Sequence, residues 1–407
     1  MFTSLFSLFV IVVTIAGIAA GRYPHLRMNR ATIALVGAAT LAAIGAISSE
    51  QAYEALDLGT LMLLLAMMII NANLRIAGFF GLVAERILPR ARSPRLLLLM
   101  VMVSAGLLSA LFLNDTIVLV FTPLLLEIVL ALGRNPIPYL MGLATAANIG
   151  SAGAITGNPQ NMLIGASSGI PYLKFSMYLM PVAIIGLLCA WGILILVYRK
   201  EFTKVFDTFV PHREVRIYRP LLLKSAISVM VLLTLFVAGV EVPLAAIIAA
   251  SLLLVTRRLR PERVFNEIDW SLLVLFSGLF VVTAAIETSG WGDSLFGLLL
   301  PLMDAGVLSI TVVTAALSNI ISNVPAILLF RPLVQQFSNP EQVWLILAMA
   351  STFAGNLTLL GSIANLIVAE TARRRRVTLS FTEYLKAGVP ITLLTLLIGV
   401  VWFTLLF

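Results

Sequence analysis

One carboxylate stands alone in a long apolar stretch of this sequence. Between Arg95 and Glu127 the only ionisable residue is Asp115, in the polar triplet Asn114-Asp115-Thr116. A charged side chain at bilayer depth costs about 2.5–3.5 kcal/mol on insertion scales, so such a residue is a functional candidate by default. Because a carboxyl group in apolar surroundings can take and release a proton, we expect Asp115 to be the proton-coupling residue. Capping of the helix that follows is the alternative role.

A second polar break, Ser322-Asn323, interrupts another apolar stretch and carries no charge. Amide and hydroxyl groups donate and accept hydrogen bonds while staying neutral, so they can hold a polar solute without the desolvation cost of an ion. The same groups could instead satisfy backbone atoms freed where a helix unwinds. We expect the substrate site to be formed by Asn114, Thr116, Asn148, Gly150, Thr156, Asn158, Asn161, Ser322, Asn323, Asn356, Thr358, Ser362 and Asn365.

Two further segments, 148–161 and 355–365, combine asparagines with residues that break helices. The first contains three glycines and Pro159, and the second contains Gly355 and Gly361. Proline removes a backbone donor, and glycine accepts conformations that other residues avoid. Each segment therefore predicts a helix that unwinds inside the membrane, as transporter helices do at their binding sites.

The composition sets the class of protein that must position these residues. The chain has 407 residues, of which 60% are hydrophobic and 11% are charged, whereas soluble domains carry about 25% charge. The net charge of +8 does not indicate nucleic-acid binding, because the basic residues form short clusters between apolar stretches. The single cysteine, Cys189, excludes an internal disulfide and a multi-thiolate metal site. We expect no cofactor and no metal.

The basic clusters orient the chain in the membrane. The segments 22–30, 86–95, 199–219, 257–260 and 373–376 all fall on one side of the predicted spans, which the positive-inside rule places in the cytoplasm. The first apolar stretch lacks a preceding basic region, so we expect a retained helix rather than a cleaved signal. The prediction is an all-α, multi-pass inner-membrane protein with roughly ten full spans and two hairpins.

The two halves of the sequence repeat each other. Residues 57–61 match 269–273, residues 108–114 match 317–323, and residues 157–163 match 361–367, in the same order. The helix from Asp57 runs inward on this orientation and the helix from Asp269 runs outward, so the repeats are inverted. We expect N-terminal spans in 1–56, the first repeat in 57–198, a cytoplasmic linker in 199–219, further spans in 220–268, and the second repeat with the last span in 269–407.

These motifs resemble the ion transporter superfamily. The resemblance is carried by Leu113-Asn-Asp-Thr with Thr122-Pro, by Ala147-Asn-Ile-Gly with Thr156-Gly-Asn-Pro-Gln-Asn161, and by Gly355-Asn-Leu-Thr-Leu-Leu-Gly-Ser-Ile-Ala-Asn365. The sequence is most similar to the arsenite efflux permease branch, near sodium/proton antiporters. The resemblance implies two inverted repeats, each with a re-entrant hairpin and an unwound helix, around a central site. In symporter relatives a Ser-Asn-Thr tip holds sodium; the aspartate here favours a proton.

Two transport functions are consistent with these residues. The first is efflux of arsenite or antimonite in exchange for protons, because a neutral trihydroxy solute needs hydrogen-bonding partners and the four interrupted segments contain no lysine or arginine. The second is sodium- or proton-coupled transport of a small anion, or sodium/proton exchange, for which the hairpins offer helix N-termini. A channel or a non-transporting scaffold is disfavoured, because inverted repeats enclose the polar site.

We expect no enzymatic activity, because the interrupted segments lack a paired nucleophile and base. No phosphate-binding loop of the Gly-x-x-x-x-Gly-Lys type is present, so the chain does not hydrolyse ATP itself. The expected partners are a small inorganic solute, protons and membrane lipid. A soluble ATPase partner could attach to cytoplasmic loops such as 199–219, and the sequence leaves the oligomeric state open.

Overall fold

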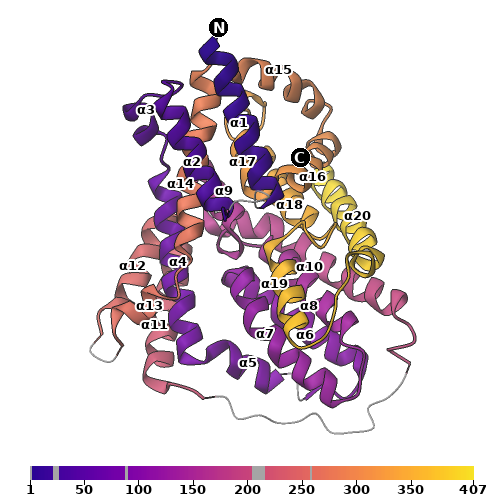
Figure 1. Cartoon of the computed structure of the whole chain (residues 1–407). Helices are drawn as coiled ribbons and strands as arrows, with labels where there is room; N and C mark the ends of the chain where they lie inside the picture. Colours follow the sequence, from indigo (N-terminus) through magenta and orange to yellow (C-terminus); the bar gives the residue numbers. More distant parts are fainter. Residues whose placement is uncertain (1, 22–26, 88–89, 204–215, 257–258) are drawn as a thin grey trace.

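A computed structural model describes residues 2–21, 27–87, 90–203, 216–256 and 259–407, and over these residues the fold is built from helices without β-strands (Figure 1). The linker predicted for 199–219 lies largely outside the described residues. The helices of the first half are α1 (Phe2–Ala20), α2 (Arg30–Ala43), α3 (Ser49–Glu54), α4 (Leu58–Ala77), α5 (Phe79–Ile87), α6 (Pro94–Leu111), α7 (Asn114–Ala131), α8 (Ile137–Ser151), η2 (Ile155–Gly157), α9 (Pro159–Ser168) and α10 (Tyr172–Val197).

The second half repeats this order. Its helices are α11 (Arg219–Val237), α12 (Val242–Leu254), α13 (Pro261–Phe265), α14 (Trp270–Thr288), α15 (Gly292–Met303), α16 (Val307–Ile321), α17 (Asn323–Phe330), η3 (Val334–Gln336), α18 (Pro340–Ala354), α19 (Ile363–Arg374) and α20 (Phe381–Leu406). Each α-helix from α1 to α10 has a counterpart ten places later. The domain boundaries predicted from the sequence remain a proposal, and we propose in addition that α1–α3 and α11–α13 begin the two repeats.

The repeats are inverted, as predicted. Helix α4 runs from α3 at the upper end of Figure 1 to α5 at the lower end, whereas α14 runs from α13 upward to α15. The hairpin of α6 and α7 lies toward the lower end, and the hairpin of α16 and α17 toward the upper end. The two hairpins therefore approach the centre from opposite sides, which confirms the predicted architecture.

Helix lengths agree with a multi-pass membrane protein. Over the described residues, seven helices are long and apolar enough to cross a bilayer, namely α4, α6, α7, α10, α11, α14 and α20, and α1, α2, α12 and α16 are shorter apolar helices. Helices α6, α7 and α16 belong to the hairpins. The eight that remain, with the broken helices α8–α9 and α18–α19, make the ten full spans expected from the sequence.

The matched aspartates of the two repeats share a structural role. The Asp57 carboxylate accepts a hydrogen bond from the Thr60 amide at 2.9 Å at the start of α4, and Asp269 accepts one from the Leu272 amide at 3.2 Å at the start of α14. Each bond satisfies one of the free N–H groups of a first helical turn. The matching segments 57–61 and 269–273 thus each begin a helix with a capping aspartate.

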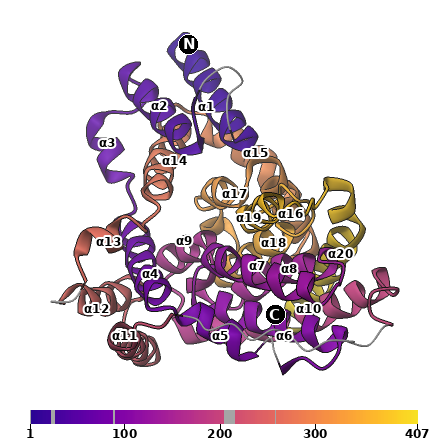
Figure 2. The same cartoon turned by 60° about the horizontal axis from the view of Figure 1, so that its bottom comes forward.

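The helices form two groups, shown in Figure 2. The first, which we call the arc, contains α1–α4 and α11–α14; α2 packs on α14, and α12 packs on α4. The second, which we call the bundle, contains α6–α10 and α16–α20; α6 packs on α8, α16 on α18, and α10 on α20. Helices α5 and α15 connect the arc to the bundle. Both groups contain helices from both repeats.

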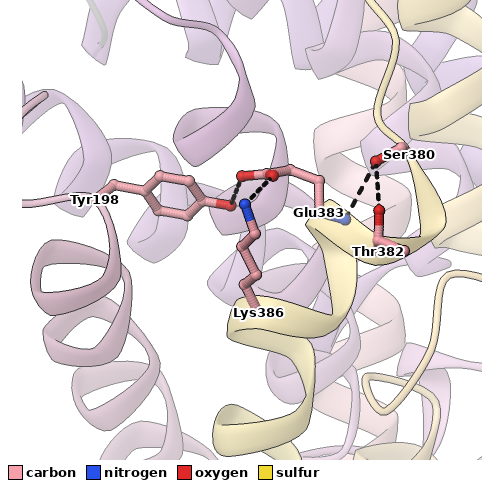
Figure 3. Close-up of polar contacts among 5 residues, drawn as sticks. All are labelled: Tyr198, Ser380, Thr382, Glu383 and Lys386. Atoms are coloured by element: carbon pink, nitrogen blue, oxygen red, sulfur yellow. Dashed lines mark hydrogen bonds and ion pairs between the residues drawn. The ribbon is translucent and has the colours of Figure 1, made fainter.

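Polar contacts fasten the bundle near the ends of its long helices. The Tyr198 hydroxyl, just after α10, donates to a Glu383 carboxylate oxygen of α20 at 3.0 Å, and Lys386 pairs with the other oxygen at 2.5 Å (Figure 3). Near the start of α10, Lys174 pairs with Glu341 of α18 at 2.6 Å. The Tyr198–Glu383 and Lys174–Glu341 contacts join helices of different repeats within the bundle.

Candidate functional site

Asn148, near the end of α8, lies where the first hairpin meets both broken helices. Its Oδ1 accepts hydrogen bonds from Asn114 Nδ2 at 3.1 Å and from Ser362 Oγ at 2.9 Å. Its Nδ2 donates to Asn356 Oδ1 at 2.9 Å and to Asn365 Oδ1 at 3.1 Å. The five side chains are buried. The sequence pattern predicted that these asparagines lie close together, and they do. Asn148 and Asn356 are bonded although more than two hundred residues separate them in the sequence.

The breaks in the two unwound helices are held by matched asparagines. Asn161 Nδ2 lies 3.0–3.3 Å from three backbone carbonyl oxygens, those of Ser151, Ala152 and Ala154. In the second repeat Asn365 Nδ2 donates to the carbonyls of Gly355 at 2.8 Å and Thr358 at 3.2 Å. These carbonyls have lost helical partners, and the amides replace them. The alternative role considered for the asparagines thus applies to this pair.

The first break is also anchored to its neighbours. Asn158 caps α9 by accepting from the Asn161 amide at 2.8 Å, and its Nδ2 reaches Thr352 of α18 at 3.2 Å. Thr156 donates to the carbonyl of Ala110 in α6 at 3.2 Å.

Backbone packing holds the hairpin against α8. A Cβ on Gly150 would lie 2.2 Å from the carbonyl oxygen of Gly106 in α6. No side chain fits at that distance, so Gly150 allows the backbones of α6 and α8 to touch.

A small cavity lies between the two hairpin tips. Its volume is about 60 Å³, enough for a few water molecules. Six of the predicted site residues line it, namely Asn114, Asp115, Asn148, Ser322, Asn323 and Ser362. The other eight do not line it in this conformation, and their role as substrate ligands remains a prediction: Thr116, Gly150, Thr156, Asn158, Asn161, Asn356, Thr358 and Asn365.

The two tips present different groups to the cavity. Asp115 lies in the first turn of α7, where its amide donates to Asn114 Oδ1 at 2.9 Å. In the second tip Ser322 has φ +80°, a conformation that costs a non-glycine residue about 1–3 kcal/mol. Within the described residues, the buried Oδ1 of Asn323 has no hydrogen-bond partner. The second tip therefore combines backbone strain with a free acceptor, a combination typical of a binding site.

Two cavity-lining polar residues were missed by the sequence interpretation. Arg30, which was expected in a cytoplasmic loop, is the first residue of α2 and faces the cavity from the arc. Gln160, in the first turn of α9, also lines it and donates to Thr352 Oγ1 at 3.3 Å. Asn29 caps α2 and forms a capping box with Thr32, and this pattern could have placed Arg30 on a helix.

Inverted repeats, two re-entrant hairpins and two broken helices around a central polar cavity define a multi-pass secondary transporter. Residues 8–354 match the CitMHS citrate transporter family, and the chain belongs to this family of the ion transporter superfamily. The predicted membership of the superfamily is thus confirmed.

Similar proteins include named and unnamed transporters. The silicon efflux transporter LSI3 of Oryza sativa is 30% identical, with 93% of each chain covered. A 46 kDa membrane protein of Mycobacterium leprae is 32% identical over 97% of this chain and 96% of its own. The putative transporter arsB of Dictyostelium discoideum is 26% identical over 92% of this chain and 87% of its own.

Among solved structures, a crystal structure of the Alcanivorax borkumensis YdaH transporter has the same fold. The TM-score is 0.55 at 17% sequence identity, with 99% of this chain and 98% of that chain covered. At this identity the likeness concerns the fold alone.

Proposed function

We propose that this protein exports arsenite or antimonite from the cytoplasm in exchange for protons. The observation that carries the proposal is the central cavity, whose hairpin tips offer neutral amides and hydroxyls beside a single carboxylate. Arsenous and antimonous acids are neutral and carry only hydroxyl groups near pH 7. A neutral solute avoids the desolvation cost of an ion and needs donors and acceptors instead.

The size of the cavity supports a small solute. A space of about 60 Å³ is small, and a compact solute fits it more readily than an extended tricarboxylate such as citrate. The free Oδ1 of Asn323 can accept a hydrogen bond from a solute hydroxyl. The Ser322 hydroxyl and the Gln160 amide line the same space and can donate to its oxygens.

The names of two relatives point the same way. One is described as a silicon efflux transporter and another as a putative arsB transporter. Silicic acid, like arsenous acid, is a small neutral molecule whose oxygens are hydroxyls. A shared preference for such solutes would explain why one fold serves both.

Proton coupling is assigned in this proposal to Asp115. It is the only carboxylate among the residues lining the cavity, and it lies at a tip that also holds Asn114 and contacts Asn148. A protonated and an ionised carboxyl bind a neutral solute with different affinities, and exchange requires such a difference. The protein is a multi-pass membrane transporter, and we propose the inner membrane of a bacterium as its location.

A thermal-shift screen on the purified protein tests the substrate. We expect antimonite and arsenite to raise the melting temperature, with no shift from sulfate, succinate or sodium. Asn323→Ala should lose the shift, whereas Asn339→Ala, at the start of α18 and outside the cavity, should keep it. A shift with the anions and none with antimonite would overturn the proposal.

Transport of a small carboxylate anion is the second candidate. The family description names citrate, and Arg30 supplies a positive charge to the cavity wall. A citrate-induced shift that disappears in Arg30→Gln would favour this function over arsenite efflux.

A further inference from the structure

We propose that a second cavity, between α3, α14 and the end of α17, is an access path to the central cavity, and that Glu54 and Glu287 make it selective against anions. We call this space the outer cavity. Both glutamates and Arg331 line it, and its volume is about 440 Å³. The inference rests on the proposed transport of a neutral solute, which it deepens by assigning residues that exclude charged competitors.

Helix α14 runs along both cavities. Its residues Leu272 and Leu275 line the central cavity, and Phe280, Thr283 and Glu287 line the outer cavity. Spacings of three to five residues keep all five on one side of the helix, because a turn takes about 3.6 residues. From Leu275 to Phe280 the helix rises about 7.5 Å, at about 1.5 Å per residue. The two cavities therefore lie end to end along this helix.

The second hairpin flanks the same two cavities from the bundle. Asn323 and Pro325 line the central cavity, whereas Leu328 and Arg331, one turn or more farther along the chain, line the outer cavity. Helix α17 packs against α14, so one pair of helices borders both spaces. The buried side chains of Phe280 and Leu328 face the outer cavity from the two helices. The path between these helices leads to the free acceptor of Asn323.

The outer cavity reaches the surface at one end of the molecule. Glu287 lies in the last turn of α14 and Glu54 ends α3, and both side chains are exposed. Helix α14 runs upward in Figure 1, so the opening lies toward the upper end. The orientation predicted from the basic clusters places this end away from the cytoplasm. On that orientation, a solute leaves and a proton enters through the outer cavity.

The charges around the outer cavity do not cancel. Arg331 pairs with Asp57 at 3.2 Å, and the Ser167 hydroxyl donates to the same carboxylate oxygen at 3.5 Å. The positive charge of the arginine is therefore offset by Asp57. Within the described residues, Glu54 and Glu287 form no ion pair. The two glutamates thus give the outer cavity a net negative charge.

A net negative charge in a protein-walled cavity acts on solutes by their sign. Such a cavity focuses the field, which raises the local concentration of cations and lowers that of anions. Neutral arsenous and antimonous acids are not repelled, and protons are attracted. Anions such as sulfate or a carboxylate are depleted at the opening, so they are disfavoured before they reach the central cavity.

Because the chain has a single cysteine, thiol chemistry can measure the field in the outer cavity. Thiol labelling uses purified protein carrying Cys189→Ser and Thr283→Cys. Two methanethiosulfonates of similar size are compared, one bearing a sulfonate and the other a trimethylammonium group. Relative to a free thiol in solution, we expect the cationic reagent to be favoured by at least about tenfold. The preference should shrink at high salt, since the Debye length falls to about 3 Å at about 1 M.

The charge assignment is tested by removing both glutamates. Glu54→Gln combined with Glu287→Gln should bring the ratio of the two rates to within about twofold of the free thiol, because the source of the field is gone. The matched control, Glu50→Gln combined with Asp304→Asn, removes the same charge at exposed positions outside the outer cavity and should keep the preference. Equal ratios in the two double variants would overturn the inference.

Antimonite exchange in liposomes tests whether the outer cavity is the path. Labelling of Thr283→Cys with a neutral methanethiosulfonate should slow exchange by at least about tenfold, because the added group fills the path. Labelling of Ser338→Cys, an exposed position outside the cavity, should leave exchange unchanged. Undiminished exchange after complete labelling of Thr283→Cys, or a thiol there that reacts with neither charged reagent, would overturn the inference. Wild-type protein without antimonite exchange defeats the proposed function, whereas the reagent rates need no substrate and test the charge selectivity separately.

Discussion

The two hairpin tips hold equivalent positions in the two repeats but present different groups to the cavity. In the first tip Asn114 is bonded to Asn148, and an ionisable residue follows it. In the second tip Ser322 is strained and Asn323 keeps a free acceptor. One duplicated scaffold thus presents a carboxylate at one tip and only neutral side chains at the other.

Thr122 and Arg331 occupy matching positions of the two hairpins, nine residues after Leu113 and Ser322. These two residues differ as well. Thr122 is buried and donates to the Val118 carbonyl within its own helix at 2.6 Å. Its counterpart, Arg331, reaches across to the arc and pairs with Asp57 at 3.2 Å. Arg331 also lines a cavity of about 440 Å³ between arc and bundle. The second hairpin is therefore tied to the arc by an ion pair for which the first has no equivalent at Thr122.

The largest effect is expected from removing the charge of the first tip. Asp115→Asn should reduce antimonite/proton exchange by at least about 100-fold, because an asparagine amide cannot take up and release a proton as a carboxyl group does. Growth of an arsenite-sensitive bacterium and vesicle transport both measure this loss. Asp304→Asn, an exposed residue at the end of α15, should behave as wild type. Full resistance in Asp115→Asn would remove this residue from the mechanism.

The matched asparagines of the broken helices should both be needed for stability. Asn161→Ala frees three carbonyls, and Asn365→Ala frees two carbonyls and removes the oxygen that accepts from Asn148 Nδ2. Each unsatisfied buried group costs about 1–3 kcal/mol, so both variants should melt at lower temperature than the wild type, by similar amounts. Thermal unfolding in detergent gives the comparison. Equal melting temperatures in both variants and the wild type would show that the amides do not stabilise the breaks.

The strain at the second tip can be relieved directly. Ser322→Gly should raise stability by about 1 kcal/mol, because glycine adopts φ near +80° without steric cost. Leu113→Gly, at the matched position of the first tip with φ −57°, should lower stability through lost burial and added backbone entropy. A destabilised Ser322→Gly would mean that the serine hydroxyl outweighs the strain.

The smallest effect is expected at the ion pair with Asp57. Arg331 is 39% exposed, and exposed pairs contribute about 0–1 kcal/mol. Arg331→Gln should therefore change the melting temperature only slightly. Its effect should appear instead in the access of a thiol reagent to a cysteine placed at Ser167, which lies beside the pair. Unchanged access would show that the ion pair does not restrain the outer cavity.

Much of the fold could be predicted from the sequence, because local patterns determined it. Two recurring motifs predicted the inverted repeat. One is the helix start at Asp57 and Asp269, and the other is an asparagine that follows a glycine by four residues, at Asn161 and Asn365. The same amide pattern predicted that Asn148 and Asn356 belong to one site. The orientation of the chain in the membrane, which the basic clusters predict because lysine and arginine favour the cytoplasmic side, stays a prediction.

Two residues of the candidate site, Arg30 and Gln160, could not be predicted from the local sequence pattern. Arg30 reaches the cavity only because α2 packs on α14, a helix of the other repeat. Nothing in the residues around it indicates that partner. Gln160 lies in a run of helix-breaking residues, and its neighbour Asn161 contacts the backbone carbonyls of the break. Side chains whose role depends on a distant helix need the tertiary structure to be recognised.

In the arc, helices of one repeat pack on helices of the other, and this packing has a consequence for the origin of the protein. Helix α2 packs on α14 and α12 packs on α4, so each half completes the other. A half-length ancestor with this fold could have closed its structure only by pairing with a second copy inserted in the opposite orientation. Fusion of two such copies would fix one orientation for each half, and an aspartate could then be kept at one tip without appearing at the other.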